Sequence, residues 1–169
     1  IASQMERGEV DLLLASERIV PATMKARPLI HGRFVMAQRK GHPRGNVPLD
    51  LDAYCGLQHV LVTEVGGSMR GYVDDNLASQ GRQRNVVLSV EKFMLVPEIL
   101  RNSNLVCTVP SMLMSRFADV LDMFELPFSD RGFGLRLAWH PRNHGDPAVS
   151  WLRALLEKAM ATTAALLSD

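Results

Sequence analysis

Residues 59–63 (HVLVT), followed by residues 65–68 (VGGS), decide how the chain is expected to fold. The first segment is a short apolar run typical of a buried strand, and two glycines and a serine follow it where a helix begins. Residues 69–79 have helical spacing, and residues 86–90 (VVLSV) are a second apolar run. This order of strand, turn, helix and strand predicts an α/β fold.

The surrounding sequence repeats this pattern. Residues 1–7 indicate the end of a helix that Gly8 stops, and residues 10–15 (VDLLLA) are typical of a strand buried in a parallel sheet. Asp146 and Pro147 open a long closing helix that runs to about Leu167. The other elements that we expect are strands at 26–30, 33–38, 105–109 and 135–140 and helices at 91–101 and 112–120. Strands that alternate with helices predict mostly parallel sheets.

The pattern also predicts two lobes. Residues 39–48 are rich in glycine, proline and charge, which indicates a turn or a linker between lobes. We expect one lobe at residues 1–37 and 128–169 and the other at residues 42–124, so the chain would cross between lobes twice. In open α/β sheets ligands bind outside the carboxyl ends of the strands, which predicts a ligand site in the cleft between the lobes.

The composition is that of a soluble globular protein. The 169 residues are 47% hydrophobic and 22% charged, which suits one compact domain or two small lobes. The formal net charge of +1 argues against a nucleic-acid platform. No apolar run approaches the roughly 20 residues that a membrane-spanning helix needs. Cys55 and Cys107 lie far apart in the sequence, which predicts two buried thiols and a reducing, cytoplasmic location.

No group of residues predicts catalysis or a metal site. The sequence has no Gly-x-Ser-x-Gly motif, and its five histidines have no ligand partners at metal spacing. Asp74 and Asp75 would point about 100° apart on a helix, so we expect a solvated face and no carboxylate pair. Arg82 and Arg84 are interpreted as ordinary surface charge. We therefore expect no enzyme, no metal and no cofactor.

Two features predict ligand contacts. The free backbone amides of the helix after residue 68 favour an anion, and Ser68 either caps that helix or donates to a ligand. Arg33, at the start of a strand, either holds a carboxylate through paired hydrogen bonds or forms a surface salt bridge. The residues alone leave these alternatives open.

A series of motifs along essentially the whole chain resembles one family. The motifs are Gly8-Glu9-Val10-Asp11-Leu12, His42-Pro43, the strand–Gly-Gly-Ser–helix segment, Leu105-Val106-Cys107-Thr108-Val109-Pro110, and Trp139-His140 through Asp146-Pro147 to Trp151-Leu152-Arg153. In this order they resemble the effector-binding domain of LysR-type transcriptional regulators. The nearest branch contains the regulators of aromatic degradation and nodulation.

The resemblance implies two Rossmann-like lobes of the periplasmic-binding-protein type II kind, with two crossovers and a small carboxylate or aromatic inducer in the cleft. It also implies a bacterial transcription factor whose N-terminal helix-turn-helix, together with the first strand of the first lobe, would precede Ile1. DNA would be bound only through that absent segment, and no membrane is involved. The family forms homodimers or higher homo-oligomers, and the equivalent dimer elements here are residues 1–15 and 69–90.

The family also implies where the inducer is held. The expected contacts are Ser16, Arg33, Thr63, Gly67, Ser68, Met69 and Arg70. Gly145 stands where the aromatic-degradation branch often has an arginine, which argues against an aromatic acid such as salicylate.

The expected function is ligand sensing by the regulatory domain of a transcription factor. The main alternative is a periplasmic-type solute-binding protein for transport, which has a similar fold. A helix-turn-helix encoded before Ile1 would favour regulation, whereas a signal peptide would favour transport. A third alternative is a two-lobed enzyme on the same scaffold, which no sequence motif supports.

Overall fold

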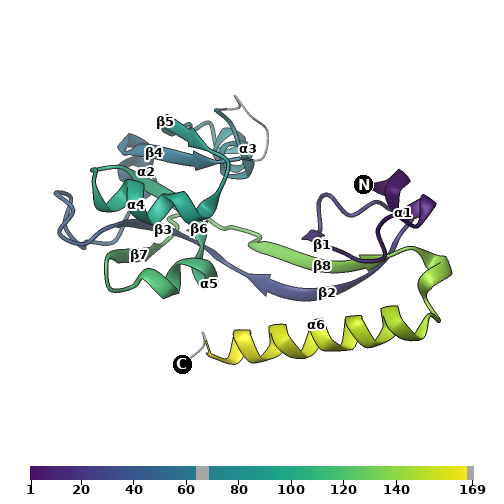
Figure 1. The fold of residues 1–169 in the computed structure, drawn as a ribbon. Coiled ribbons are helices and arrows are strands. Elements are labelled where there is room, and N and C mark those ends of the chain that lie inside the picture. The colour runs from purple at the N-terminus through teal and green to yellow at the C-terminus, as the bar shows by residue number, and fades with distance from the viewer. Residues whose placement is uncertain (64–68, 167–169) are drawn as a thin grey trace. The chain divides into compact units, whose positions relative to one another are not determined.

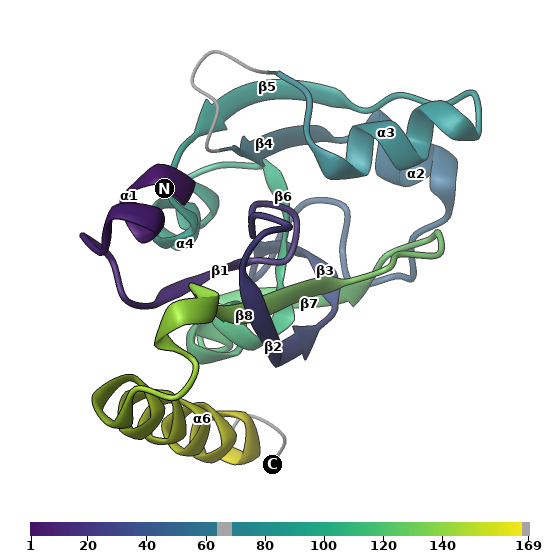
Figure 2. The same ribbon diagram turned by 90° about the vertical axis from the view of Figure 1, so that its right-hand side faces the viewer.

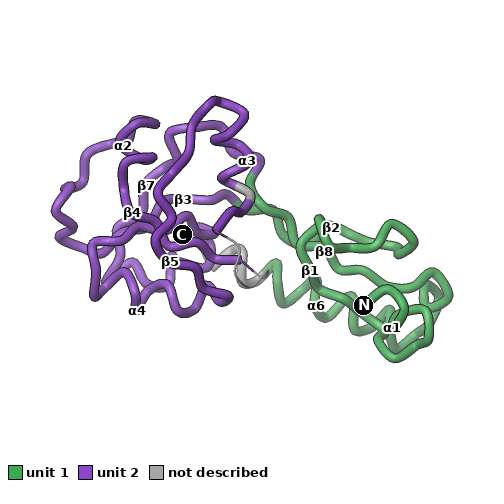
Figure 3. Tube along the Cα trace, turned by 90° about the horizontal axis from the view of Figure 1, so that it is seen from above, with its two compact units in different colours: residues 1–32, 132–169 green, residues 33–131 purple. Residues whose placement is uncertain are grey.

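The computed structural model describes residues 1–63 and 69–166 (Figure 1). Its contacts divide the chain into two compact units, unit 1 with residues 1–32 and 132–169 and unit 2 with residues 33–131 (Figure 3). The chain therefore leaves unit 1 once and returns to it once. The predicted boundary at residue 37 puts most of the strand Phe34–Arg39 in the first lobe, whereas both strands that pair with it belong to unit 2.

Unit 1 is built on a three-stranded antiparallel sheet. The strand order is β1 (Leu13–Ser16), β8 (Phe133–Trp139) and β2 (Lys25–Gly32). Strand β8 comes from the returning part of the chain and pairs antiparallel with both of its neighbours. Met5, Met24 and Ala138 form the buried core of this unit.

Two helices of unit 1 have ends that confirm the local sequence signals. Helix α1 (Ala2–Arg7) ends at Gly8, whose φ of 77° is the left-handed conformation that glycine adopts without strain. Helix α6 (Pro147–Leu166) follows η3 (Pro141–Asn143), a short 3₁₀ helix. The Oδ1 atom of Asp146 accepts a hydrogen bond from the N–H of Val149 at 2.9 Å, so Asp146 caps α6 as predicted.

Unit 2 is built on a five-stranded mixed sheet. The strand order is β5 (Asn85–Val90), β4 (Gln58–Val62), β6 (Val106–Pro110), β3 (Phe34–Arg39) and β7 (Leu121–Glu125). Strand β4 runs parallel to both β5 and β6, whereas β3 runs antiparallel to β6 and β7. A helical crossover leads from β4 to β5 and another from β5 to β6, which is the connection that parallel neighbours need.

Helices cover both faces of this sheet (Figure 2). The helical elements of unit 2 are α2 (Leu51–Gly56), α3 (Tyr72–Ser79), η1 (Phe93–Leu95), α4 (Val96–Arg101), α5 (Ser111–Met114) and η2 (Ser115–Phe117). On one face, α2 and α3 bury Tyr54 and Leu77 against Met36 of β3. On the other face, α4 and α5 bury Leu100 and Met114.

The prediction of mostly parallel sheets is wrong. Among the strands that the structure describes, only the two pairs made by β4 are parallel. Strands β2 and β3 follow one another where the chain passes from unit 1 to unit 2, and β7 and β8 follow one another where it returns. The outgoing and returning strands pair antiparallel, β2 with β8 and β3 with β7. The strand predicted at residues 10–15 overlaps β1, which pairs antiparallel with β8 and leaves Leu14 46% exposed.

Three helices of unit 2 differ from the prediction. Helix α3 begins at Tyr72, three residues later than the helical spacing from residue 69 predicts. Residues 112–120 do not form one helix, because α5 ends at Met114 and gives way to η2. Helix α2 is not among the predicted elements, although Asp50 caps it by accepting the N–H of Ala53 at 2.7 Å.

Candidate functional site

The carboxyl ends of β4, β5 and β6 lie at one edge of the five-stranded sheet. Phe34 begins β3 and pairs with Pro110 at the end of β6, so β3 starts at the same edge. Since His59 pairs with Val106, the same register places Thr63 level with Pro110. We call this the strand-end edge, marked by Phe34, Thr63 and Pro110. Ligands of α/β proteins bind outside such an edge.

Two of the predicted contacts belong to the strand-end edge. Arg33 immediately precedes β3, and its carbonyl oxygen accepts the N–H of Ser111 at 3.0 Å. Thr63 immediately follows β4, and its N–H donates to the carbonyl oxygen of Val90 at 3.0 Å. The backbone of both residues is therefore held by hydrogen bonds within unit 2.

The other predicted contacts have different positions. Met69 and Arg70 lie just before α3, and both are exposed. Gly67 and Ser68 lie outside the described residues, so the two interpretations of Ser68 stay open. Ser16 ends β1 in unit 1 and is half-buried.

The side chain of Arg33 forms an ion pair with Glu125, the last residue of β7. The two side chains are 66% and 69% exposed. Of the two interpretations of Arg33, this geometry corresponds to the surface salt bridge. An exposed pair of this kind is worth at most about 1 kcal/mol, so another carboxylate could replace Glu125 at small cost.

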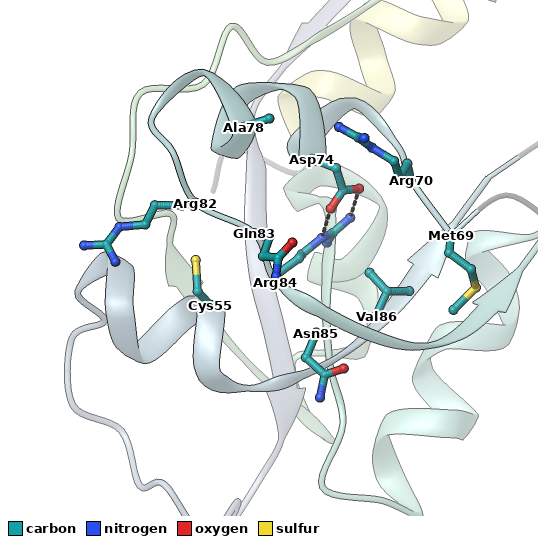
Figure 4. A pocket seen from close by; sticks show the side chains of 10 residues that line it. All are labelled: Cys55, Met69, Arg70, Asp74, Ala78, Arg82, Gln83, Arg84, Asn85 and Val86. Carbon is teal, nitrogen blue, oxygen red and sulfur yellow. Dashed lines mark hydrogen bonds and ion pairs between the residues drawn. The ribbon is translucent and has the colours of Figure 1, made fainter.

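A cavity of about 750 Å³ lies beside α3, and Met69 and Arg70 contribute to its lining (Figure 4). These two residues lie on one side of the cavity, Cys55 and Arg82 lie on the other, and a hydrogen-bonded Asp74–Arg84 pair lies between them. The volume falls in the range of roughly 300–1,000 Å³ that small-molecule sites occupy. Two residues predicted from the sequence thus share one cavity in unit 2.

The pair of Asp74 and Arg84 is the central electrostatic feature of this cavity. The Nε and Nη2 atoms of Arg84 donate to the two carboxylate oxygens of Asp74 at 2.8 and 2.9 Å. The side chains are only 2% exposed for Arg84 and 11% for Asp74. Asp74 Oδ2 also accepts the N–H of Gly71 at 2.7 Å, which fixes the start of α3.

The pKa values of this pair reflect its burial and its geometry. Burial alone would raise the pKa of Asp74, but the hydrogen bonds and charge of Arg84 outweigh burial, so this pKa lies below its usual value. Burial alone would lower the pKa of Arg84, but the hydrogen bond to Asp74 outweighs it, so the pKa of Arg84 is raised. Both groups therefore stay charged near neutral pH.

The expectation that Asp74 and Arg84 lie at the surface is wrong. Both side chains are largely buried, because Arg84 lies beneath α3, just before β5, and binds Asp74 in the first turn of α3. The expectation holds for their neighbours. Asp75 is 79% exposed, and Arg82 is 48% exposed in a 2.9 Å ion pair with Asp52.

A second buried polar group joins α2 to the sheet. The hydroxyl groups of Tyr54 and Thr108 lie 2.6 Å apart. Tyr54 is fully buried and Thr108 is 8% exposed. Burial raises the pKa of Tyr54, while the positive charge of the nearby Arg84 acts in the opposite direction. Tyr54 and Thr108 therefore form a buried hydroxyl pair near the pair of Asp74 and Arg84.

His59 of β4 packs beside this group. Its ring centroid lies 4.6 Å from that of Tyr54, and its Nε2 atom lies 2.8 Å from the carbonyl oxygen of Tyr54. A carbonyl oxygen can only accept, so Nε2 carries the proton and Nδ1 is the unprotonated nitrogen. Nδ1 is buried and has no hydrogen-bond partner within the described part of the chain. Burial lowers the pKa of His59 to about 4.

A smaller cavity of about 80 Å³ lies at the strand-end edge. Its apolar walls are Phe34, Val60, Leu61, Val62, Val73 and Phe93. Thr108 and Arg84 supply its polar lining. Arg84 thus lines both cavities, whereas Asp74 lines only the larger one.

The sequence reasoning does not find Tyr54, Arg84 or Thr108. A partial signal is present, because Asp74 falls in the first turn of the predicted helix and Arg84 follows the end of that helix at Gly81. No local spacing indicates the contact of Tyr54 with Thr108, since 54 residues separate them.

The cysteines and histidines have largely structural surroundings. Both cysteines are free, and Cys107 is fully buried with its pKa raised to about 12, as expected for an apolar thiol. Cys55 is only partly buried. Among the described residues, no three His, Cys, Asp or Glu side chains are grouped so that they could hold a metal ion. No helix in the part of the chain that the structure describes is long and apolar enough to cross a membrane.

The LysR substrate binding domain family matches residues 1–161. Over 154 residues the chain is 30% identical to the HTH-type transcriptional activator NahR of Pseudomonas putida, covering 90% of this chain and 51% of NahR. Over 160 residues it is 27% identical to the HTH-type transcriptional regulator SyrM of Rhizobium meliloti strain 1021, covering 94% of this chain and 49% of SyrM. The chain therefore spans about half the length of these curated relatives.

Solved structures show the same likeness. The regulatory domain of MexT, a transcriptional activator in Pseudomonas aeruginosa, has a TM-score of 0.76 and 29% identity, covering 92% of this chain and 76% of that one. The effector binding domain of QuiR in complex with shikimate has a TM-score of 0.75 and 15% identity, covering 95% of this chain and 77% of that one. The second likeness concerns the fold alone.

Proposed function

Because this chain belongs to the LysR substrate-binding domain family, we propose that it binds a small effector at the strand-end edge of unit 2. The family match over residues 1–161 carries this proposal. The structure neighbours are regulatory domains of that family, with the type II periplasmic-binding-protein fold, so the predicted fold class is confirmed. The relatives are named as transcriptional regulators, which does not favour the transport alternative.

The effector that we propose carries a carboxylate, which Arg33 binds. The support is the exposed ion pair with Glu125, because it presents the Arg33 guanidinium at the strand-end edge to a carboxylate partner. A guanidinium and a carboxylate can form two parallel hydrogen bonds, which gives such a contact both strength and orientation. In the bound protein the effector carboxylate takes the place of Glu125.

The remaining predicted residues complete the proposed site. Thr63 lies at the strand-end edge as Arg33 does, with β6 between their strands, and Met69 and Arg70 line the larger cavity beside α3. Ser16, Gly67 and Ser68 are further proposed contacts on the family's precedent. None of these residues is assigned a catalytic role, in keeping with relatives that are regulators.

The length and the names of the relatives support a proposal for the full-length protein. They are about twice as long as this chain and are named as HTH-type regulators. We propose that the full-length protein acts in the bacterial cytoplasm as a homodimer or higher homo-oligomer and binds DNA through a helix-turn-helix segment. An effector changes the population of two conformations only by the difference in its affinity for them.

Thermal unfolding of the full-length protein tests effector binding. A panel of aliphatic and aromatic mono- and dicarboxylates is added at increasing concentration. A ligand present at 100 times its Kd stabilises the native state by about 2.7 kcal/mol, which raises Tm by several degrees. The expected result is a saturable rise in Tm with at least one carboxylate.

The matched control for Arg33 is Arg101, another exposed arginine, 57% exposed in an ion pair with Glu98. Arg33→Gln should abolish most of the rise in Tm, whereas Arg101→Gln should leave it unchanged. If no carboxylate in the panel changes Tm, the proposed effector class is wrong. If a carboxylate acts equally on both variants, Arg33 is not the residue that binds it.

A further inference from the structure

The smaller cavity lies beneath the strand-end edge rather than outside it. In the sheet, Met36 pairs with Thr108, and the register of β4 with β6 places Leu61 level with Thr108 as well. Thr63 and Pro110 lie two residues further along these strands, about 7 Å nearer the edge. A ligand held at the edge therefore has the cavity directly below it, inside unit 2.

The size of this cavity suits a small chemical group. A cavity needs about 10–15 Å³ of space open to the centres of water molecules for each water molecule that it holds. The volume of about 80 Å³ therefore accommodates about six non-hydrogen atoms. Its six apolar lining residues come from β3, β4, α3 and η1, so an apolar group would contact carbon on most sides.

The polar wall of the cavity contains the hydroxyl group of Thr108. Its oxygen lies 2.6 Å from the Tyr54 hydroxyl oxygen, and either hydroxyl can donate to the other. When Tyr54 donates, the Thr108 O–H is available as a donor toward the cavity. Asp74 holds Arg84, the second polar lining residue, through both carboxylate oxygens.

We propose that this cavity is a subsite for a small apolar group of the effector that carries a hydrogen-bond acceptor, such as a ring bearing a phenolic or carbonyl oxygen. The apolar part packs against Phe34, Val62 and Phe93, and the acceptor binds the Thr108 hydroxyl. Thr108 is therefore a specificity-determining residue that selects effectors by the presence of that acceptor. The identification of the occupant as part of an effector rests on the proposed function.

Phenol and benzene are suitable probes because they do not depend on the carboxylate site. Phenol is a six-membered ring with one acceptor oxygen, and benzene is the same ring without it. The experiment titrates each probe at millimolar concentration into methyl-labelled full-length protein and follows the valine and leucine methyl signals by NMR. We expect phenol to shift the signals of Val60, Leu61, Val62 and Val73 saturably, and benzene to bind more weakly.

Variants of two lining residues separate the acceptor contact from the packing. Thr108→Val keeps the shape of the side chain but removes the hydroxyl, and should weaken phenol binding two- to tenfold without weakening benzene. Thr108→Ser keeps the hydroxyl and should restore the preference for phenol over benzene. Val62→Leu fills the cavity and should weaken both probes, whereas Val20→Leu, the same change at a half-buried position of unit 1, should weaken neither.

The outcomes distinguish this inference from the proposed function. If phenol shifts none of the lining methyl signals, or if Thr108→Val weakens both probes equally, the subsite is wrong even where a carboxylate raises Tm. If phenol binds as described but no carboxylate raises Tm, the subsite stands and the carboxylate proposal fails. The methyl spectrum of each variant without probe verifies that it is folded, and Val62→Leu tests the cavity should Thr108→Val unfold.

Discussion

Two of the arginine–carboxylate pairs in unit 2 lie in opposite environments. Arg33 and Glu125 are 66% and 69% exposed, whereas Arg84 and Asp74 are 2% and 11% exposed. The exposed pair is screened by water and can exchange its partner at little cost. The buried pair cannot, because a buried charge that loses its partner is strongly destabilising. The same two chemical groups therefore hold structure beneath α3 and, in our proposal, serve recognition at the strand-end edge.

Removal of the buried carboxylate should produce the largest effect on stability. Asp74→Ala leaves the Arg84 guanidinium buried without its partner and also removes the acceptor for the N–H of Gly71. We expect the free energy of unfolding to fall by about 3–5 kcal/mol. Urea unfolding followed by circular dichroism measures this change.

The neighbouring residue supplies the control for this comparison. Asp75→Ala removes a carboxylate that is 79% exposed and should change the free energy of unfolding by less than about 0.5 kcal/mol. Equal effects of the two substitutions would show that burial does not separate the two classes of charge. A small loss for Asp74→Ala would mean that water reaches Arg84 in the variant.

The next largest effect is a loss of stability in mild acid, caused by His59. Its pKa is lowered from 6.5 to about 4 in the folded chain because the ring is buried. As the pH falls from 6.5 toward 4, the unfolded chain binds a proton at this residue and the folded chain does not. Stability is therefore lost over this window, by roughly 3 kcal/mol in total, and levels off below pH 4 as far as His59 is concerned.

Unfolding free energies measured between pH 7 and pH 4 test this prediction. His59→Phe removes the titrating group while keeping an aromatic ring beside Tyr54, and should flatten the dependence on pH. Asp74, whose pKa is lowered in the folded chain, adds to the loss of stability mainly toward and below pH 4, where the unfolded chain takes up its proton.

The sequence could predict features that depend on neighbouring residues, and it could not predict features that depend on tertiary structure. The ends of α1 and α6 depend on residues within one helical turn, so Gly8 and Asp146 indicate them correctly. The direction of β3 and β7 depends on where the chain crosses between units, and apolar runs carry no record of direction. The fold class was therefore predictable from motif order, while strand direction was not.

The candidate site divides in the same way. The place of Arg33 at the start of a strand could be predicted because it depends on the local sequence, and its role as a ligand contact stays a prediction. The role of Arg84 depends on a contact across ten residues of helix and turn, and that of Thr108 on a contact across 54 residues. The polar wall of the smaller cavity is assembled from β6 and the residue before β5, so tertiary packing alone brings it together.

The exposed pair should give the smallest effect on stability and a clear effect on binding. Glu125→Gln removes the charge that competes for Arg33, and should change the free energy of unfolding by less than about 1 kcal/mol. Because an incoming carboxylate no longer has to displace Glu125, its affinity should rise, by up to about fivefold for a pair worth about 1 kcal/mol. Calorimetric titration of a carboxylate found by thermal unfolding measures this change. Glu98→Gln, at another exposed pair, should leave affinity unaltered. A fall in affinity on Glu125→Gln would mean that Glu125 orients Arg33 for the ligand rather than competing with it, and the exchange mechanism would have to be abandoned.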